Sequence, residues 1–122
     1  MDSAIRGARE VFFLVGRGEA VLWSDASRSP VALPDSRRRW EMIWEHRGEI
    51  EELSHSHPRG PLAFSTEDET TMQALDSALG RALVFSVVAP AGMIRAEAGA
   101  VSAVHAEPWW TELLRRASHM DP

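Results

Sequence analysis

The sequence predicts a single α/β (α+β) domain, built as a mixed β-sheet that is flanked by helices. The chain has 122 residues, the length of one ordinary domain, so residues 1–122 are expected to form one unit. Short apolar runs typical of strands alternate with segments in which apolar residues recur at helical spacing. Some neighbouring runs are separated by short glycine-containing turns, as in β-hairpins, and this favours a mixed sheet in a three-layer domain.

The first half of the chain predicts a hairpin, a loop and a helix. Residues 10–16 read EVFFLVG and residues 20–23 read AVLW, with a glycine-containing turn between them. Residues 24–34 contain two prolines and several other turn residues, so they are expected to connect the hairpin to the next element. Asp35 is then expected to cap a helix that ends at Gly48.

The second half predicts a strand, a helix, three more strands and a last helix. Residues 49–57 are short enough for a strand, and the prolines and glycine at 58–61 break the chain after it. A helix is expected to begin near Ser65 or Thr66 and to end at Leu79, with Gly80 as its C-cap. The remaining elements are expected as strands at residues 82–89, 93–97 and 99–104, and as a helix from Pro108 through Arg116.

Most of the five tryptophans are expected to pack in the core. Trp109 and Trp110 are adjacent and cannot both face inward, so one of them is expected to be exposed or to lie in an interface. Leu113 and Leu114 are expected on the buried face of the same helix, and the Arg37–Arg39 triplet on a solvated helix face.

Composition excludes several classes of function. The chain has no cysteine, which excludes a disulfide framework, a thiolate nucleophile and a thiolate metal site. Its net charge of −5 argues against binding to nucleic acid through general basicity. No run of 18 apolar residues is present, and the start MDSAIRGARE is too charged and too short for a signal peptide. A cytoplasmic protein without a nucleic-acid or membrane partner is therefore expected.

Residues 55–68 contain the residues best suited to chemistry. His55 and His57 lie two apart at the end of a predicted strand, so they point to the same side. Asp68 follows eleven residues after His57, in the first turn of a predicted helix, and a loop of that length can return it to the histidines. Two imidazoles and one carboxylate suit a catalytic Zn²⁺ site with a fourth position for water. Alternatively, Ser65 and Asp68 have the spacing of a capping box, and an isolated H-x-H pair is usually inert.

The whole string resembles the motif of the JAMM metalloproteases, also called the MPN or Mov34/PAD-1 family. His55, Ser56, His57 and Pro58 match its first part, and Ser65 and Asp68 complete it after the expected seven residues 58–64. The resemblance implies the compact prokaryotic form of the family, with a JAMM/MPN-like, cytidine-deaminase-like three-layer architecture. It implies one Zn²⁺ per chain on His55, His57 and Asp68, and Ser65 as the residue that helps stabilise the tetrahedral intermediate.

The resemblance also implies an upstream glutamate as general base, and Glu10 is the candidate. In the family this residue lies on or beside the first strand and precedes a pattern like E-x-x-G-L-x-x-G. Here Phe13 replaces the first glycine and Gly16 comes one position early, so alignment on Gly16 would place Arg9 there instead. A β-bulge would restore the match. Otherwise Glu10 would be a solvated charge at the edge of a strand.

The function that the resemblance implies is that of a zinc metallo-isopeptidase or peptidase. It would hydrolyse an amide bond at the C-terminus of a ubiquitin-like or sulfur-carrier-like protein, whose tail lies along a strand edge. Two alternatives stay open: a zinc hydrolase of short peptides or small amides, and a non-catalytic binding module of the same fold. Only nine residues precede Glu10, where family members usually have a helix, so a partner subunit or a homodimer is expected to cover the core.

Overall fold

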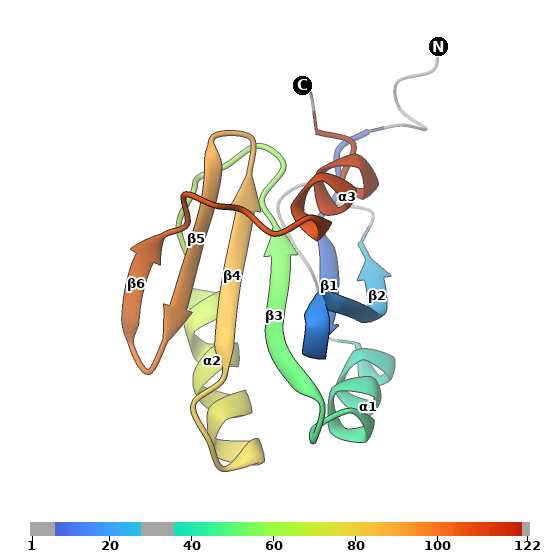
Figure 1. Cartoon of the computed structure of the whole chain (residues 1–122), viewed down its shortest axis with the longest axis vertical. Coiled ribbons are helices and arrows are strands. Elements are labelled where there is room, and N and C mark those ends of the chain that lie inside the picture. The colour runs from blue at the N-terminus through green and yellow to red at the C-terminus, as the bar shows by residue number, and fades with distance from the viewer. Residues whose placement is uncertain (1–6, 28–35, 121–122) are drawn as a thin grey trace.

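The computed structural model of the protein describes residues 7–27 and 36–120. These residues form a six-stranded sheet and three α-helices, in the order that the sequence predicts (Figure 1). The elements are β1 (Val11–Gly16), a short 3-10 helix (Arg17–Glu19), β2 (Ala20–Ala26), α1 (Arg37–Glu45), β3 (Ile50–Ser56), α2 (Thr66–Leu79), β4 (Val84–Ala89), β5 (Gly92–Glu97), β6 (Ala100–Ala103) and α3 (Trp110–Ala117). Within the described ranges, no helix has the length and apolar character needed to cross a membrane.

The sheet is mixed, as predicted, and its strand order is β2-β1-β3-β4-β5-β6. Only β3 and β4 pair in parallel, and α2 connects them as a crossover helix. The other four pairs of neighbouring strands are antiparallel. The parallel pair therefore lies at the centre of the sheet, and the end of β3 is followed by the loop that leads to α2.

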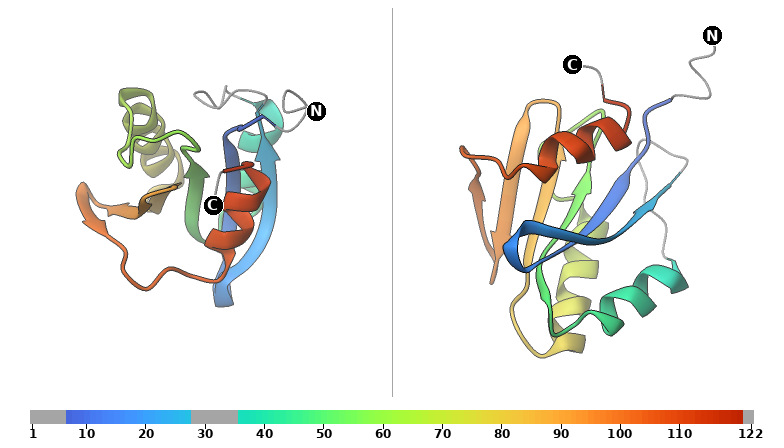
Figure 2. Two further views of the ribbon diagram at one scale, coloured as in Figure 1. Left: turned by 90° about the horizontal axis from the view of Figure 1, so that it is seen from above. Right: turned by 45° about the vertical axis from the view of Figure 1, so that its right-hand side comes forward.

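Helices cover both faces of the sheet, so the domain has three layers (Figure 2). Phe12 and Leu14 of β1 belong to the core on the side of α1 and α2. Val11, Phe13 and Val15 alternate with them and pack with Trp110 and Leu114 of α3 on the other side. This explains why β1 reads as an almost continuous apolar run, because a strand buried on both faces needs apolar residues at every position.

The start of α1 and the end of β2 differ from the prediction. Strand β2 continues to Ala26, which pairs with Val11, so residues 24–26 are not a loop. Asp35, the predicted cap, lies outside the described residues, and the Ser36 side chain accepts a hydrogen bond from the Arg39 backbone N–H. The last residue of α1 is Glu45, three before Gly48, because the backbone leaves the helix at His46.

The arginine triplet is not uniformly solvated. The Arg39 guanidinium lies 2.9 Å from the Asp25 carboxylate, and only 12% of its side chain is exposed. The prediction of a solvated face was therefore wrong for this residue, because the extension of β2 brings Asp25 under α1. Arg37 and Arg38 remain exposed and lie near Glu41 on the same helix.

The buried face of α3 is narrower than predicted. Trp110 is 1% exposed and Trp109 is 58% exposed, which confirms that only one of the two faces inward. Leu114 lies one turn after Trp110 and is fully buried, whereas Leu113 is 43% exposed. The inward assignment of Leu113 was wrong because a helix of eight residues presents only one such stripe to the sheet.

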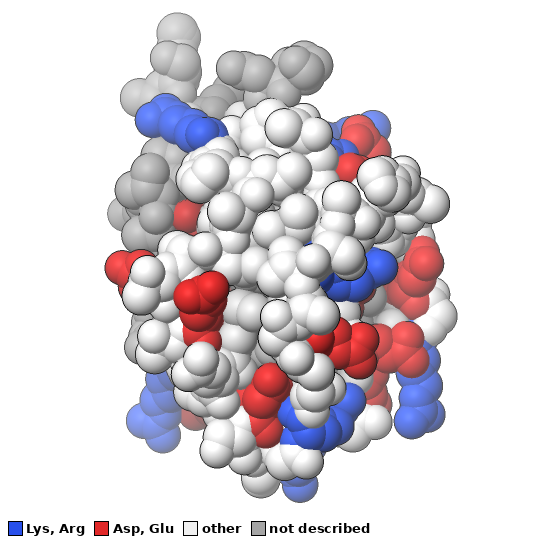
Figure 3. Space-filling model, turned by 90° about the vertical axis from the view of Figure 1, so that its left-hand side faces the viewer, with Lys and Arg blue, Asp and Glu red and all other residues white. Residues whose placement is uncertain are grey.

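The edge of the sheet at β6 faces the viewer in Figure 3. All four residues of β6 are exposed and uncharged. Acidic and basic side chains lie over the lower part and the margins of this face, and its upper centre has no charged side chains (Figure 3). The described surface is therefore of mixed charge here, without a basic tract.

Candidate metal centre

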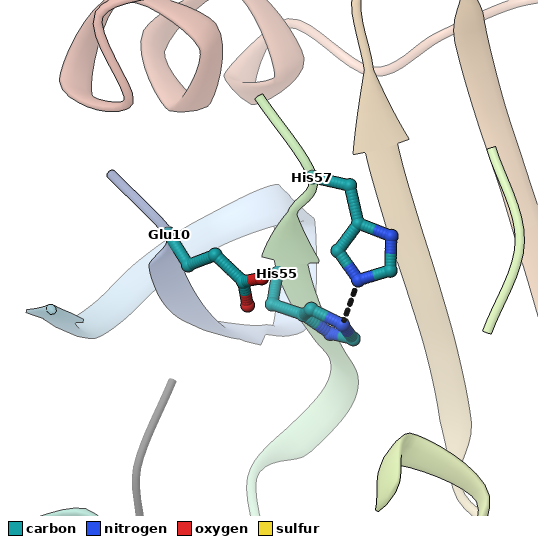
Figure 4. Close-up of side chains that lie close together, drawn as sticks. All are labelled: Glu10, His55 and His57. Carbon is teal, nitrogen blue, oxygen red and sulfur yellow. Dashed lines mark hydrogen bonds between the residues drawn. The ribbon is translucent and has the colours of Figure 1, made fainter. Parts of the chain in front are cut away.

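The end of β3 brings the two histidines of the motif together. Side chains alternate along the strand, so His55 and His57 follow Leu53 on the side of α1 and α2. The His57 backbone N–H donates to the Val88 carbonyl at 2.9 Å, which continues the pairing with β4 for one residue beyond β3. The two Nε2 atoms lie 3.1 Å apart (Figure 4). The predicted common orientation of the histidines is confirmed.

The start of α2 returns Asp68 to this pair. Asp68 Oδ2 lies 3.2 Å from His55 Nε2 and 3.4 Å from His57 Nε2. The same residue forms a capping box with Ser65: the Ser65 N–H donates to Oδ2 at 2.8 Å, and the Asp68 N–H donates to Ser65 Oγ at 3.0 Å. The capping interpretation of these two residues is correct, and the cap is also what holds the carboxylate toward the histidines.

The three candidate donor atoms, one from each of His55, His57 and Asp68, have the spacing of a coordination polyhedron. Atoms arranged tetrahedrally at about 2.0–2.1 Å from one zinc ion lie about 3.3 Å from one another. The three separations between His55 Nε2, His57 Nε2 and Asp68 Oδ2 are 3.1, 3.2 and 3.4 Å. The donors are therefore already close to the distances at which a small divalent cation would hold them.

Strand pairing places Glu10 beside the histidines. Phe12 of β1 pairs with His55 of β3 in an antiparallel register, so Glu10, two residues earlier, lies next to His57. Glu10 is 5% exposed, and its carboxylate points toward the histidine pair (Figure 4). The ligand atoms of Glu10, His55 and His57 lie within 4.8 Å of one another, and this group could hold a metal ion.

The spacing between Glu10 and Gly16 does not prevent this placement. The pairing of β1 shifts register between Leu14 and Val15 on the side of β2, and between Val15 and Gly16 on the side of β3. At each shift the extra residue belongs to the partner strand, Leu22 in β2 and Glu51 in β3. Along β1 the side chains alternate between the two faces without a break, so this strand has no bulge that would restore the motif spacing. The pairing of Phe12 with His55, and not the spacing to Gly16, places Glu10 beside His57. Glu10 is accordingly not a solvated edge charge.

No known protein-family model matches the sequence, and a comparison with curated proteins finds no significant match.

The electrostatic state of the site reflects burial and mutual contacts. Burial raises the pKa of Glu10, although the nearby His55 and His57 act in the opposite direction. Burial would also raise the pKa of Asp68, but hydrogen bonds from His55 and His57 outweigh it and hold this pKa well below its usual range. Among the described residues, no side chain donates a hydrogen bond to the Glu10 carboxylate. The site thus contains one strongly ionised carboxylate and one that binds a proton more readily.

A hydrogen bond to a backbone carbonyl fixes the orientation of the His57 ring. Its Nδ1 lies 2.9 Å from the Pro61 carbonyl oxygen, and because a carbonyl only accepts, Nδ1 carries the proton. In the neutral ring, Nε2 therefore has a free lone pair directed at His55 and Asp68. A second partner of this kind is typical of histidines that bind metals, since it sets both tautomer and ring orientation.

The site opens into a cleft of about 1100 Å³ on the side of α1 and α2. Glu10, His55, His57, Ser65 and Asp68 all line it. All five predicted site residues therefore line one cavity. The ionisable groups of four of them lie close together, and Ser65 is the exception.

The motif serine Ser56 connects the end of β3 to β1 and α3. It lies between the two histidines and so faces the opposite side of β3, where it is fully buried. Its Oγ accepts a hydrogen bond from the Val11 N–H at 2.9 Å and lies 2.6 Å from Ser118 Oγ, just after α3. Ser56 thus holds the residue next to Glu10 against β3. Strand alternation was the signal that could have found it.

We expect Ser56→Ala to destabilise the protein by about 1–3 kcal/mol, because the buried Val11 N–H loses its acceptor. Ser54→Ala is the matched control, since Ser54 is equally buried on the same strand and side but makes only a 3.5 Å contact to the Ser86 carbonyl. Denaturant unfolding of the two variants measures the difference. Equal loss of stability in both would contradict the role given to Ser56.

The metal-free protein should lose stability as the pH rises through neutrality. Burial lowers the pKa of His57, but contacts with Asp68 and the Pro61 carbonyl outweigh it, so the pKa in the folded state lies above 6.5. A raised pKa contributes stability that is complete below the unfolded value and is lost as pH passes the folded value. We expect the midpoint of thermal unfolding, measured with a chelator present, to fall between about pH 6 and pH 8.

Zinc should reverse this dependence, because a metal binds the neutral imidazole and its binding releases protons. Asp68→Asn is the control in the metal-free state, since it removes the charge that favours protonated His57. The explanation fails if the metal-free variant keeps the pH dependence of the parent protein.

Proposed function

We propose that this chain is a zinc-dependent metallo-isopeptidase or peptidase of the JAMM class. The observation that carries the proposal is the triangle of His55 Nε2, His57 Nε2 and Asp68 Oδ2, with edges of 3.1–3.4 Å and the buried Glu10 carboxylate beside it. The motif His55-Ser56-His57-Pro58 with Ser65 and Asp68, and the three-layer order of elements, support the same assignment.

Two imidazole nitrogens and a carboxylate oxygen are a donor set that suits catalytic zinc. We assign Asp68, rather than Glu10, as the third ligand. Asp68 Oδ2 is within 3.4 Å of both histidine nitrogens, whereas Glu10 forms no hydrogen bond or ion pair with either imidazole in the described structure. Glu10 is then free for a different role at the edge of the same site.

When bound, zinc supplies an acidified water and a polarised scissile carbonyl. The Glu10 carboxylate takes a proton from the water and delivers it to the leaving amine, and its raised pKa brings its basicity closer to neutral pH. Ser65 Oγ accepts from the Asp68 N–H, which leaves the hydroxyl proton to be donated to the oxyanion of the tetrahedral intermediate.

The proposed substrate is an amide bond at the C-terminus of a ubiquitin-like or sulfur-carrier-like protein. An extended tail would add to a strand edge near the site. The edge strand closest to the metal centre is β2, because it pairs with β1 and its Ser27 N–H, just past the strand, donates to the Glu10 carbonyl at 2.9 Å.

The first test is zinc content per chain in protein purified without added metal. About one zinc per chain, together with cleavage of ubiquitin-like fusion proteins, would support the proposal. A zinc protein that cleaves only short peptides or small amides would support the hydrolase chemistry but not the substrate. Failure to take up zinc when it is supplied would instead indicate a non-catalytic binding module.

A further inference from the structure

The chain just before Glu10 is bound to the end of α3, on the face of the sheet opposite the metal centre (Figure 1). The Arg9 backbone N–H donates to the Ser118 carbonyl at 3.1 Å. The Arg9 side chain donates through Nε to the Ala117 carbonyl at 2.9 Å, where the end of a helix leaves carbonyls without partners in the helix. The residue before Glu10 is therefore attached to α3 by both its backbone and its side chain.

Buried hydroxyl groups connect the residue after Glu10 to the same helix. Ser118 Oγ lies 2.7 Å from the Leu114 carbonyl oxygen, which can only accept, so the Ser118 hydroxyl donates there. Ser56 Oγ, 2.6 Å away, then donates to Ser118 Oγ and accepts from the Val11 N–H at 2.9 Å. In this arrangement every donor of the chain is used, which matters because Val11, Ser56 and Ser118 are all at most 2% exposed.

Glu10 is thus fixed through its two neighbours and through its own backbone. Its carbonyl accepts from the Ser27 N–H at 2.9 Å on the side of β2. Among the described residues, no hydrogen bond or ion pair joins its carboxylate to either histidine. The direction of the carboxylate therefore depends on where the backbone holds residue 10, and a shift of about 1 Å at a reacting group can reduce the rate about 100-fold.

We infer that Ser118 is a positioning residue for Glu10, which it holds at the site through Ser56 and Arg9. The inference rests on the proposed function and adds a residue that touches neither metal nor substrate, because Ser118 is fully buried on the other face of the sheet. Its carbonyl accepts from Arg9 and its hydroxyl is joined to Ser56, so the contacts of both chain neighbours of Glu10 meet at this residue. A change at Ser118 should therefore alter the rate of hydrolysis without altering zinc content.

Ser118→Ala tests this role. It removes one hydroxyl, and the Leu114 carbonyl keeps its hydrogen bond from the backbone N–H of residue 118 at 3.0 Å, whereas the Ser56 hydroxyl loses its acceptor. For the fusion protein or peptide that the zinc protein cleaves, we expect kcat to fall about 10–100-fold, with KM and zinc content unchanged. Thr111→Val is the matched control, because it removes a hydroxyl that is also buried on α3 but donates to the Pro108 carbonyl. It should keep the parental kcat.

A double-mutant cycle separates positioning from a general loss of structure. If Ser118 acts through the Glu10 carboxylate, Ser118→Ala should slow the Glu10→Gln protein less than about twofold, because the base is already lost. A merely structural effect would slow both proteins equally, and this result overturns the inference. Arg9→Met is a second variant in case Ser118→Ala does not fold. It removes the Nε bond to the Ala117 carbonyl, and it should lower kcat in the parent but not in Glu10→Gln.

NMR on the metal-free protein tests the connection without catalysis. In Ser118→Ala, the Val11 amide proton should exchange with solvent about tenfold faster, relative to the slowest amides of the sheet. The signal of the Glu10 carboxyl carbon should shift in the same variant, and Thr111→Val should change neither observable. Unchanged exchange together with an unchanged Glu10 signal in Ser118→Ala would overturn the inference.

The two proposals fail in different ways. If the parent protein hydrolyses no substrate while the NMR results are as expected, the proposed function is wrong, whereas the connection from Ser118 to Glu10 is confirmed. If the parent hydrolyses substrate and Ser118→Ala keeps the parental kcat, Ser118 does not position the base and the hydrolase proposal stands.

Discussion

Glu10→Gln should keep its zinc and hydrolyse substrate about 10²–10⁴-fold more slowly than the parent protein. The amide has the shape of the carboxylate but cannot accept the proton of the attacking water. Glu10 has no hydrogen-bonded partner side chain among the described residues, so the substitution leaves no donor unpaired. Metal analysis and steady-state kinetics on the same preparation provide the measurement.

Glu51→Gln is the matched control for Glu10, since Glu51 is an exposed glutamate on β3, outside the cleft. It should retain both zinc and activity. Full activity of Glu10→Gln would show that Glu10 is not the base. Loss of zinc from Glu10→Gln would instead make Glu10 a ligand, in agreement with the close group that it forms with His55 and His57.

His57→Ala should abolish stoichiometric zinc binding. The ring provides one corner of the ligand triangle, and its Nδ1 contact with Pro61 already orients the other nitrogen toward that position. Because the loss of even an outer partner of a ligand costs about 10–100-fold in metal affinity, loss of the ligand itself should cost more than about 100-fold. Zinc titration with a competing chelator measures the change.

His105→Ala, at an exposed histidine, should bind zinc as the parent does. Asp68→Asn is a second variant, which keeps an oxygen that can accept from the Ser65 N–H and so preserves the helix cap. It should weaken zinc binding even if His57→Ala proves unstable. Undiminished zinc in both variants would exclude the proposed ligand set.

Local sequence rules were sufficient to predict most of the candidate metal centre. Alternation along a strand predicts that His55 and His57 share a side, and helix-capping rules predict that α2 begins near Ser65 or Thr66, where the structure has Ser65 as its N-cap. Both are decided by neighbouring residues, so they can be predicted without knowledge of the rest of the fold. The return of Asp68 to the histidines follows from the short connection between β3 and α2.

The position of Glu10 could not be predicted in this way. Its place beside His57 depends on the antiparallel pairing of Phe12 with His55, which does not appear in the spacing of EVFFLVG. The contact of Arg39 with Asp25 is of the same kind, since it requires β2 to extend beneath α1. Both contacts join segments that are distant in the chain, and no periodic pattern in the sequence indicates that these segments meet.

The sequence by itself determined the order of the elements and the residues that can bind a metal, because period, caps and turns act over a few residues. Only the tertiary structure decided which side chains meet. It placed Glu10 beside His57, connected Ser56 to Val11 and Ser118, and left an apolar cleft between two helices that are far apart in sequence. These features depend on strand register and packing, which are set by the burial of the whole core rather than by any one segment.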